Sequence, residues 1–211
     1  MSCWKPCARR VQNSRVSKWS YIANWVIGLS AGLTLLIGGI LAGSAVPSTQ
    51  PDQPYFLSMV LSAIGWAGIS WAVLTLLRFV HRMWSALPGG AVSPQRAAGF
   101  LLIPVFNLYW MVRVFAGFAR QANQALEARG ETARLPLGLF AIFSESCALT
   151  LVGAAVTVAM PFSPAGRAVA LATFACAAVS AILAVYVMAV AGDAIVVLEA
   201  ARGREAAATA R

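Results

Sequence analysis

AVALATFACAAVSAILAVYVMAVAG, residues 168–192, contains no charged side chain. The stretch exceeds the ~20 residues that a helix needs to cross the hydrocarbon core of a bilayer. Its backbone N–H and C=O groups would find no water there, so it must form a helix that bonds to itself. It also lacks the alternation of apolar and polar residues that is typical of a transmembrane β-strand. The stretch therefore predicts a membrane-spanning helix.

Three further stretches are similarly apolar, and one of them contains a single charged residue, Glu145. The chain is 60% hydrophobic and only 11% charged, whereas a soluble domain has ~25% charged residues. We therefore predict an all-α fold, a transmembrane bundle of four helices with a re-entrant or interfacial cytoplasmic helical element at residues 93–129. The predicted spans are residues 19–46, 55–78, 136–160 and 168–195.

The distribution of basic residues predicts the topology. If both termini and the central segment are cytoplasmic, 15 of the 16 Lys and Arg residues lie inside and Arg167 alone lies outside. The positive-inside rule favours that arrangement, in the inner (plasma) membrane. Residues 1–18 then form a basic cytoplasmic segment, residues 19–200 a membrane domain and residues 201–211 a cytoplasmic tail. Because the charges flank apolar runs, we expect the anionic cytoplasmic leaflet to be their partner, and not nucleic acid.

Residues 21–45 raise the alternative of a cleaved signal peptide, since Gly43-Ser44-Ala45 loosely fits a cleavage site. The apolar region of a signal peptide has about 7–15 residues, and this one is much longer. We therefore expect an uncleaved first span.

The central segment begins with Ser93-Pro94, a typical helix start with Ser as the N-cap and Pro in the first turn. Its apolar run is too short to span a bilayer and is interrupted by Pro104, which should bend a helix. We predict a bent, hairpin-like element tucked against the bundle, in which Asn107 pairs backbone groups freed at the bend. Tyr109 and Trp110 would then anchor its exit among the lipid headgroups.

Beyond the bend, Arg113, Arg120 and Glu127 recur every seven residues. This spacing places them on one stripe of a helix, and we expect that helix to lie along the membrane surface. The residues predicted on the opposite, apolar face are Val112, Phe115, Ala119 and Ala122.

Residues 93–110 read SPQRAAGFLLIPVFNLYW. They resemble the signature, roughly P-G-x-A-x-G-F/W-x-x-I/V-P-x-x-N-L-x-x-P/W, of a family of bacterial four-span membrane proteins known as a domain of unknown function. Pro94, Gly99, Pro104 and Asn107 match the signature, and Gln95 departs from it. The resemblance implies a four-span topology with this motif between spans 2 and 3, and it implies no activity.

Glu145 lies roughly ten residues into the third predicted span, between Ser144 and Ser146. An ionisable group at that depth marks a candidate functional residue, and we expect it to face the bundle interior. Two interpretations stay open: a protonated or hydrogen-bonded carboxyl group that holds helices together, or a group on a permeation path.

Other polar groups have simpler interpretations. We expect Asp193 to form an interfacial ion pair with Arg78 or Arg82, and His81 to be solvated or lipid-facing rather than a ligand. With Cys3 and Cys7 as the only close cysteine pair, a metal site lacks ligands, so we predict no metal and no cofactor.

Small residues four apart in the first two spans predict close helix packing. We expect them to serve packing within the chain rather than a homodimer. They are Gly28, Gly32, Gly39 and Gly43 in the first span, and Ser62, Gly65, Gly68, Ser70 and Ala72 in the second.

These patterns predict a non-enzymatic protein, because H-E-x-x-H, P-loop and G-x-G-x-x-G patterns are absent. We predict an accessory, scaffolding or regulatory protein of the inner membrane with a membrane-protein partner. The alternative is a small solute or ion permease that uses Glu145. The candidate functional residues are Glu145, Pro104, Asn107, Tyr109, Trp110 and Arg113.

The topology is testable with single cysteines introduced into a variant whose native cysteines are replaced. A cysteine at position 49 should react with an impermeant thiol reagent from outside, and one at position 124 should react only after the membrane is opened, because the basic residues hold the central segment inside. External labelling at position 124 would contradict the four-span topology.

Overall fold

The computed structural model describes residues 5–44, 53–87, 89–160 and 163–209, and within these ranges the side chains of residues 5–17, 42–44, 53–55, 104, 105, 107 and 206 are not described. Throughout the described part the chain is all-α, as predicted. Four helices are long and apolar enough to cross a membrane, which also matches the prediction. The elements are α1 (Lys5–Ser44), α2 (Gln53–Ala86), α3 (Pro94–Gly99), the 3-10 helix η1 (Phe100–Leu102), α4 (Pro104–Glu127), α5 (Leu137–Ala159) and α6 (Pro164–Thr209).

Helix α1 begins well before the predicted span 19–46, and helix α6 ends well after the predicted span 168–195. Helix α6 has 46 residues, which corresponds to about 69 Å at 1.5 Å per residue. A hydrocarbon core of about 30 Å accommodates less than half of that length. The charged residues of its C-terminal part begin at Asp193, so this part has the composition of a helix in water.

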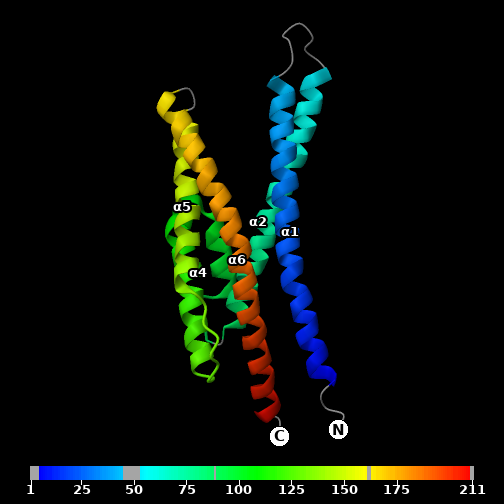
Figure 1. Ribbon diagram of the computed structural model, residues 1–211, viewed down its shortest axis with the longest axis vertical. Helices are drawn as coiled ribbons and strands as arrows, with labels where there is room; N and C mark the ends of the chain where they lie inside the picture. The colour runs from blue at the N-terminus through cyan, green and yellow to red at the C-terminus, as the bar shows by residue number, and fades with distance from the viewer. Residues whose placement is uncertain (1–4, 45–52, 88, 161–162, 210–211) are drawn as a thin grey trace. The chain divides into compact units, whose positions relative to one another are not determined.

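The chain divides into two compact units, and the boundary runs through α1 and α2 rather than between elements. The unit Trp19–Arg78 is a hairpin of these two helices, drawn in blue and cyan in Figure 1. Its helices approach closely at glycines. A Cβ atom on Gly32 would lie 2.7 Å from the Ile69 backbone nitrogen and 2.8 Å from the Gly65 carbonyl oxygen, so only hydrogen fits there.

The small residues therefore serve packing within the chain, as predicted, at Gly28, Gly32 and Gly39. The Ser58 hydroxyl adds a cross-helix bond by donating to the Gly39 carbonyl oxygen (2.6 Å). The prediction was wrong for Ser70, which is exposed because it lies on the opposite side of α2 from buried Ala72. Gly43 lies outside the residues whose packing is described.

The other unit comprises residues Met1–Lys18 and Phe79–Arg211. Helix α4 runs along α5, and α5 packs against α6, as the green, yellow and orange ribbons of Figure 1 show. Aromatic rings fill the space between α4 and α5: Phe115 meets Phe143 edge-on with centroids 4.9 Å apart, and Phe118 lies 6.4 Å from Phe140.

Two features bring the chain back from α4 into α5. Gly130 adopts φ +69°, a left-handed conformation that glycine takes without steric cost. The Asn123 side chain then bonds both backbone groups of Leu135: it donates to the carbonyl oxygen (3.0 Å) and accepts from the N–H (2.7 Å). These bonds set the register in which α4 and α5 pack.

Gly32→Ala should destabilise the α1–α2 hairpin by about 1–3 kcal/mol, because the added methyl group meets backbone atoms that cannot rotate away. Gly38→Ala is the matched control, since an added Cβ there meets nothing within 4 Å and alanine favours the helix by up to ~1 kcal/mol. Equilibrium unfolding by SDS in mixed micelles measures both. Equal stabilities of the two variants would contradict the close approach.

Candidate functional site

The segment that carries the motif is a compact turn built on aromatic packing. Ser93 caps α3, and its hydroxyl oxygen accepts from the Arg96 backbone N–H (3.4 Å). Ile103 is extended (φ −92°, ψ 108°) and Pro104 opens α4, so the helical path breaks before the proline. The predicted helix start and the predicted bend are both confirmed. A proline inside a helix removes a backbone hydrogen bond, whereas a proline in the first turn removes none. A new helix therefore begins at Pro104 instead of continuing through it.

Trp110 is the centre of this turn. It is only 7% exposed, and its indole N–H donates to the Ala97 carbonyl oxygen (3.3 Å). Its ring lies 4.9 Å from that of Phe100 and 5.3 Å from that of Phe106, centroid to centroid. The expectation that Trp110 anchors the segment among headgroups was therefore wrong. Its N–H donates within the turn, and its ring is buried against the Phe100 and Phe106 rings.

The neighbouring predicted residues lie on the surface. Tyr109 is 58% exposed, and its hydroxyl oxygen accepts from Arg113 Nη1 (2.8 Å). The Arg113 guanidinium also lies 5.9 Å from the centroid of the Trp110 ring, a distance at which a cation is attracted to an aromatic face. The side chains of Pro104 and Asn107 lie outside the described residues, so the role predicted for the Asn107 amide stays a prediction.

Apolar side chains are exposed along this turn and the start of α4. Arg113, Arg120 and Glu127 are exposed as one stripe, and Phe115, Ala119 and Ala122 lie on the opposite face, as predicted. That face packs against α5, with Phe115 on Phe143, rather than on the membrane surface as expected, because α4 runs along α5. Val112, predicted on the same apolar face, is 44% exposed because the packed face of α4 is centred on Phe115 and Phe118. The exposed apolar residues are Leu102, Ile103, Phe106, Tyr109 and Val112.

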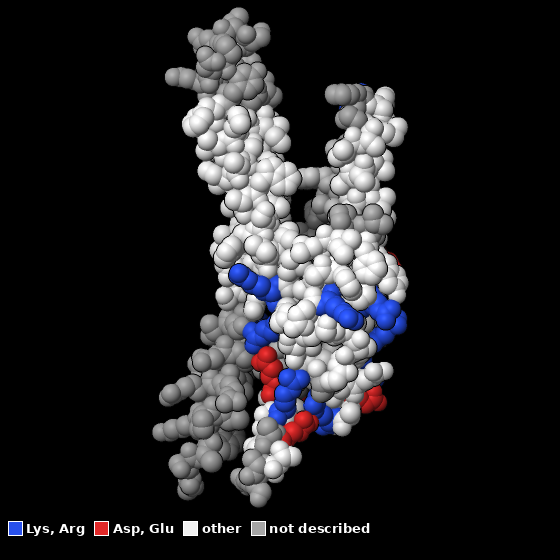
Figure 2. Space-filling view, turned by 180° about the vertical axis from the view of Figure 1, so that it is seen from behind, with Lys and Arg blue, Asp and Glu red and all other residues white. Residues whose placement is uncertain are grey.

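Ion pairs connect the C-terminal part of α6 to its neighbours. Asp193 pairs with Lys18 of α1, Glu199 with Arg82 of α2 (3.3 Å) and Glu205 with Arg129 after α4 (3.0 Å). Arg204 reaches Glu131 (3.4 Å). Figure 2 shows these blue and red side chains gathered over one part of the surface. Most of these groups are partly exposed, so each pair contributes little by itself.

One expectation about this charged region was wrong and one is confirmed. The partner of Asp193 is Lys18 rather than Arg78 or Arg82, because α6 passes close to α1 here: a Cβ atom on Gly192 would lie 3.0 Å from the Lys18 Cβ. His81 is exposed, as expected.

Arg202 bonds the end of α2 directly. Its guanidinium donates to the Ser85 and Ala86 carbonyl oxygens, each at 3.2 Å. These carbonyls end the helix and have no partner within it, and a cation there also favours the helix dipole. The sequence does not reveal these bonds, because Ser85 and Ala86 lie 117 and 116 positions from Arg202.

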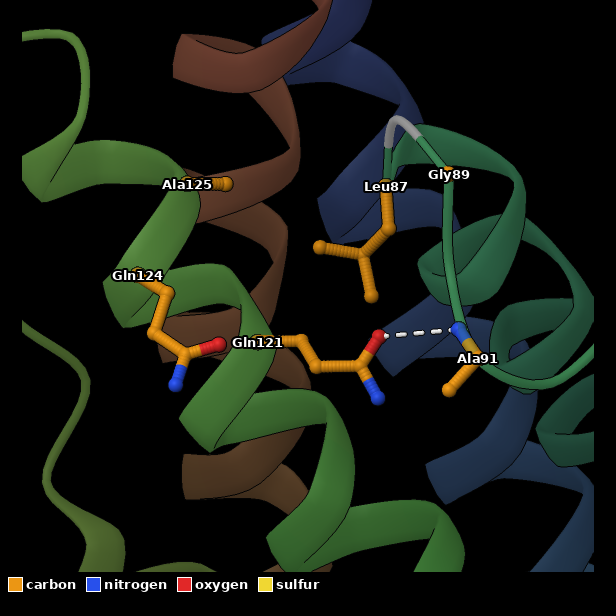
Figure 3. A pocket seen from close by; sticks show the side chains of 6 residues that line it. All are labelled: Leu87, Gly89, Ala91, Gln121, Gln124 and Ala125. Carbon is orange, nitrogen blue, oxygen red and sulfur yellow. Dashed lines mark hydrogen bonds between the residues drawn. The ribbon is translucent and has the colours of Figure 1, made fainter.

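A hollow of about 500 Å³ opens beside the turn that follows α2. Figure 3 shows the Gln121 side chain reaching from α4 to accept a hydrogen bond from the Ala91 backbone N–H (3.2 Å), with Gln124 beside it on the same helix. The amide of Gln121 is thus used to hold the turn. No charged side chain lines the hollow among the described residues.

Glu145 is exposed, and the prediction that it faces the bundle interior was wrong. Successive helical residues are rotated by ~100°. Ser144 is buried beside α4, 3.5 Å from the Met111 carbonyl oxygen, and Ser146 is buried against α6, where it accepts from Ser180 (3.0 Å). Because the two packed faces lie on either side of residue 145, its side chain must point away from both.

Its surroundings on α5 are apolar. Ile142, Leu149 and Val152 share the stripe with Glu145 and are 56%, 61% and 47% exposed. Of the six acidic residues that the structure describes, five form ion pairs, and Glu145 is the exception. This exposed carboxyl group stands eight residues from the start of α5, about 12 Å along the helix.

The hydroxyl groups between α5 and α6 form a polar seam that holds the helices. Thr150 donates to the Ser146 carbonyl oxygen (2.8 Å) and Ser180 to the Cys176 carbonyl oxygen (2.8 Å). Such bonds back to the preceding turn satisfy the hydroxyl groups without water. Cys147 and Cys176 have free thiols and are partly buried beside the seam, in keeping with the packing role expected of cysteines within apolar runs.

Residues 28–32 read GLSAG, which matches the G-x-S-x-G nucleophile pattern. That pattern places a nucleophile only at a strand-to-helix turn. Here it lies inside the continuous helix α1, and the Ser30 hydroxyl donates to the Val26 carbonyl oxygen (2.7 Å). The local structure therefore does not form a nucleophile elbow.

Comparison with protein-family models, with curated proteins and with solved structures finds no match. Across the described residues, no group of three or more His, Cys, Asp or Glu side chains is placed to hold a metal ion. The site with the most specific chemistry is therefore the outward-facing carboxyl group on α5.

Trp110→Phe should destabilise the protein by about 1 kcal/mol, because it keeps the ring packing and removes the bond to Ala97. Trp110→Ala should cost about 3–5 kcal/mol through the lost buried ring. Tyr109→Phe is the control: it removes a hydroxyl group from an exposed position and should cost less than Trp110→Phe. Thermal unfolding in detergent gives the order, and a Tyr109→Phe effect as large as that of Trp110→Ala would contradict it.

Proposed function

We propose that the chain is a non-catalytic accessory, scaffolding or regulatory protein of a bacterial inner membrane, and that it acts by binding another membrane protein. The observation that carries the proposal is the position of Glu145. It is exposed on a helix apolar enough to span a membrane, while the other described acidic residues are paired. Ionisable groups at membrane depth are costly and persist where they pair with something.

The arrangement of charge supports the membrane placement. The ion pairs lie at the end of the unit away from the turn between α5 and α6. A bilayer placed across α5 and the N-terminal half of α6 leaves them in water. We infer that this charged end is cytoplasmic, together with both termini, as in the four-span family that the 93–110 motif resembles.

The turn around Trp110 supports a re-entrant position for residues 93–110, because Met111, next to Trp110, has its carbonyl oxygen 3.5 Å from the Ser144 hydroxyl of α5. Exposed Leu102, Ile103 and Phe106 adjoin exposed Arg96 and Arg113. Apolar side chains with basic neighbours suit the boundary between acyl chains and anionic headgroups. This surface then positions the protein on the cytoplasmic leaflet.

A permease that uses Glu145 has less support. A permeation path requires the carboxyl group to line a channel between helices, whereas Glu145 points away from α4 and from α6. The hydroxyl groups that do lie between α5 and α6 bond to backbone carbonyls and to one another.

Affinity purification in mild detergent tests the proposal. We expect a membrane protein to co-purify in stoichiometric amount, and we expect the purified chain alone in liposomes to leave an imposed proton or sodium gradient intact. A chain that purifies alone and dissipates the gradient, with the activity lost in Glu145→Gln, would establish the permease instead.

A further inference from the structure

We propose that Glu145 is the docking point for a transmembrane helix of the partner protein, and that this helix carries one Lys or Arg side chain at the depth of Glu145. The inference rests on the proposed function and adds the chemistry of the partner.

The first argument is that no cation among the described residues of its unit pairs with Glu145. Among the described residues it makes no hydrogen bond and no ion pair. Arg113 lies on the helix next to α5, but its guanidinium is held by the Tyr109 hydroxyl group and the Trp110 ring. The described side chains of the unit therefore supply no charge that balances Glu145.

The second argument is the shape of the surface. Ile142, Glu145, Leu149 and Val152 lie at the three- and four-residue spacing along which one helix packs against another. The apolar residues above and below the carboxyl group are all exposed. A helix laid along this stripe would cover them and exclude lipid from the carboxyl group, and a buried carboxylate is stable only with a charged or hydrogen-bonding partner.

The third argument concerns which helix fits. A second copy of this chain would bring Glu145 against another Glu145 if the same stripes met, and two carboxylates repel. A second copy would also supply no cation from its predicted spans, because no Lys or Arg occurs in residues 19–77, 135–160 or 168–192. A partner helix with a single basic residue supplies the missing charge, and its apolar remainder matches Ile142, Leu149 and Val152.

The test uses the full chain and designed peptides of known composition. The fluorescently labelled protein is reconstituted in phosphatidylcholine vesicles, which remove any attraction to anionic lipid. It is mixed with labelled Leu-Ala helices that carry Lys, Glu or Leu at the depth of Glu145, or Lys near the far end. Energy transfer measures association. We expect the Lys helix with matching depth to associate about tenfold more strongly than the Leu helix, the factor that ~1.4 kcal/mol represents.

Variants define the role of the carboxyl group. Glu145→Gln should reduce binding of the Lys helix to the level of the Leu helix, and Glu145→Lys should favour the Glu helix instead. Glu127→Gln is the matched control, because Glu127 is an exposed acid at the end of α4, and it should bind as the unchanged protein does. Circular dichroism and size-exclusion chromatography show that each variant is folded.

Several results would overturn the inference. They are equal binding of the Lys and Leu helices, equal binding of the Lys and Glu helices, insensitivity to Glu145→Gln, or self-association of the chain that depends on Glu145. The outcome is separable from that of the proposed function. A co-purifying partner that binds Glu145→Gln unchanged leaves the accessory role standing and removes this docking point. If the Lys helix binds through Glu145 but no partner protein co-purifies from cells, the docking point on α5 stands and the accessory function is contradicted.

Discussion

A peptide group inside a bilayer has no water to bond with, and the long helices of this chain follow from that constraint. Each span satisfies its own backbone, and the hydroxyl side chains do the same. Ser146, Thr150 and Ser180 donate to carbonyl oxygens of the preceding turn or to one another. Once these groups are satisfied, the remaining freedom of a span is its rotation about its axis. That rotation decides which residues meet protein and which meet lipid.

The rotation of α5 is fixed on two sides. Phe140 and Phe143 pack against rings of α4, and Ser146 meets Ser180 of α6. These contacts leave one outward stripe on which Glu145 lies among apolar side chains. The position of one carboxyl group thus depends on aromatic packing and hydroxyl bonding by its neighbours, and the proposed accessory role rests on the direction in which that carboxyl group points.

The charged residues of α6 are concentrated in its C-terminal part. The N-terminal half of α6 carries Arg167 alone, whereas its C-terminal part carries Asp193, Glu199, Arg202, Arg204 and Glu205. Those groups bind α1, α2 and the end of α4. A single helix therefore combines an apolar half suited to lipid with a charged half suited to water. Because α6 is one continuous helix and packs along α5, the distance between its charged end and Glu145 is fixed. That distance sets the depth of Glu145 relative to the charged residues.

The amino-acid sequence alone predicts the all-α class, the four helices apolar enough to span, the cap at Ser93 and the bend at Pro104. Each of these follows from local chemistry: hydropathy over ~20 residues, a hydroxyl group before a proline, and a ring that lacks an N–H. The close helix packing at Gly28, Gly32 and Gly39 could also be predicted, because a residue without a side chain lets two helix backbones approach each other. Tertiary structure decided the rest. It turned Trp110 inward, paired Asp193 with Lys18 and pointed Glu145 outward. These outcomes depend on which helices meet and at what rotation, and a residue's own position in the sequence does not specify them.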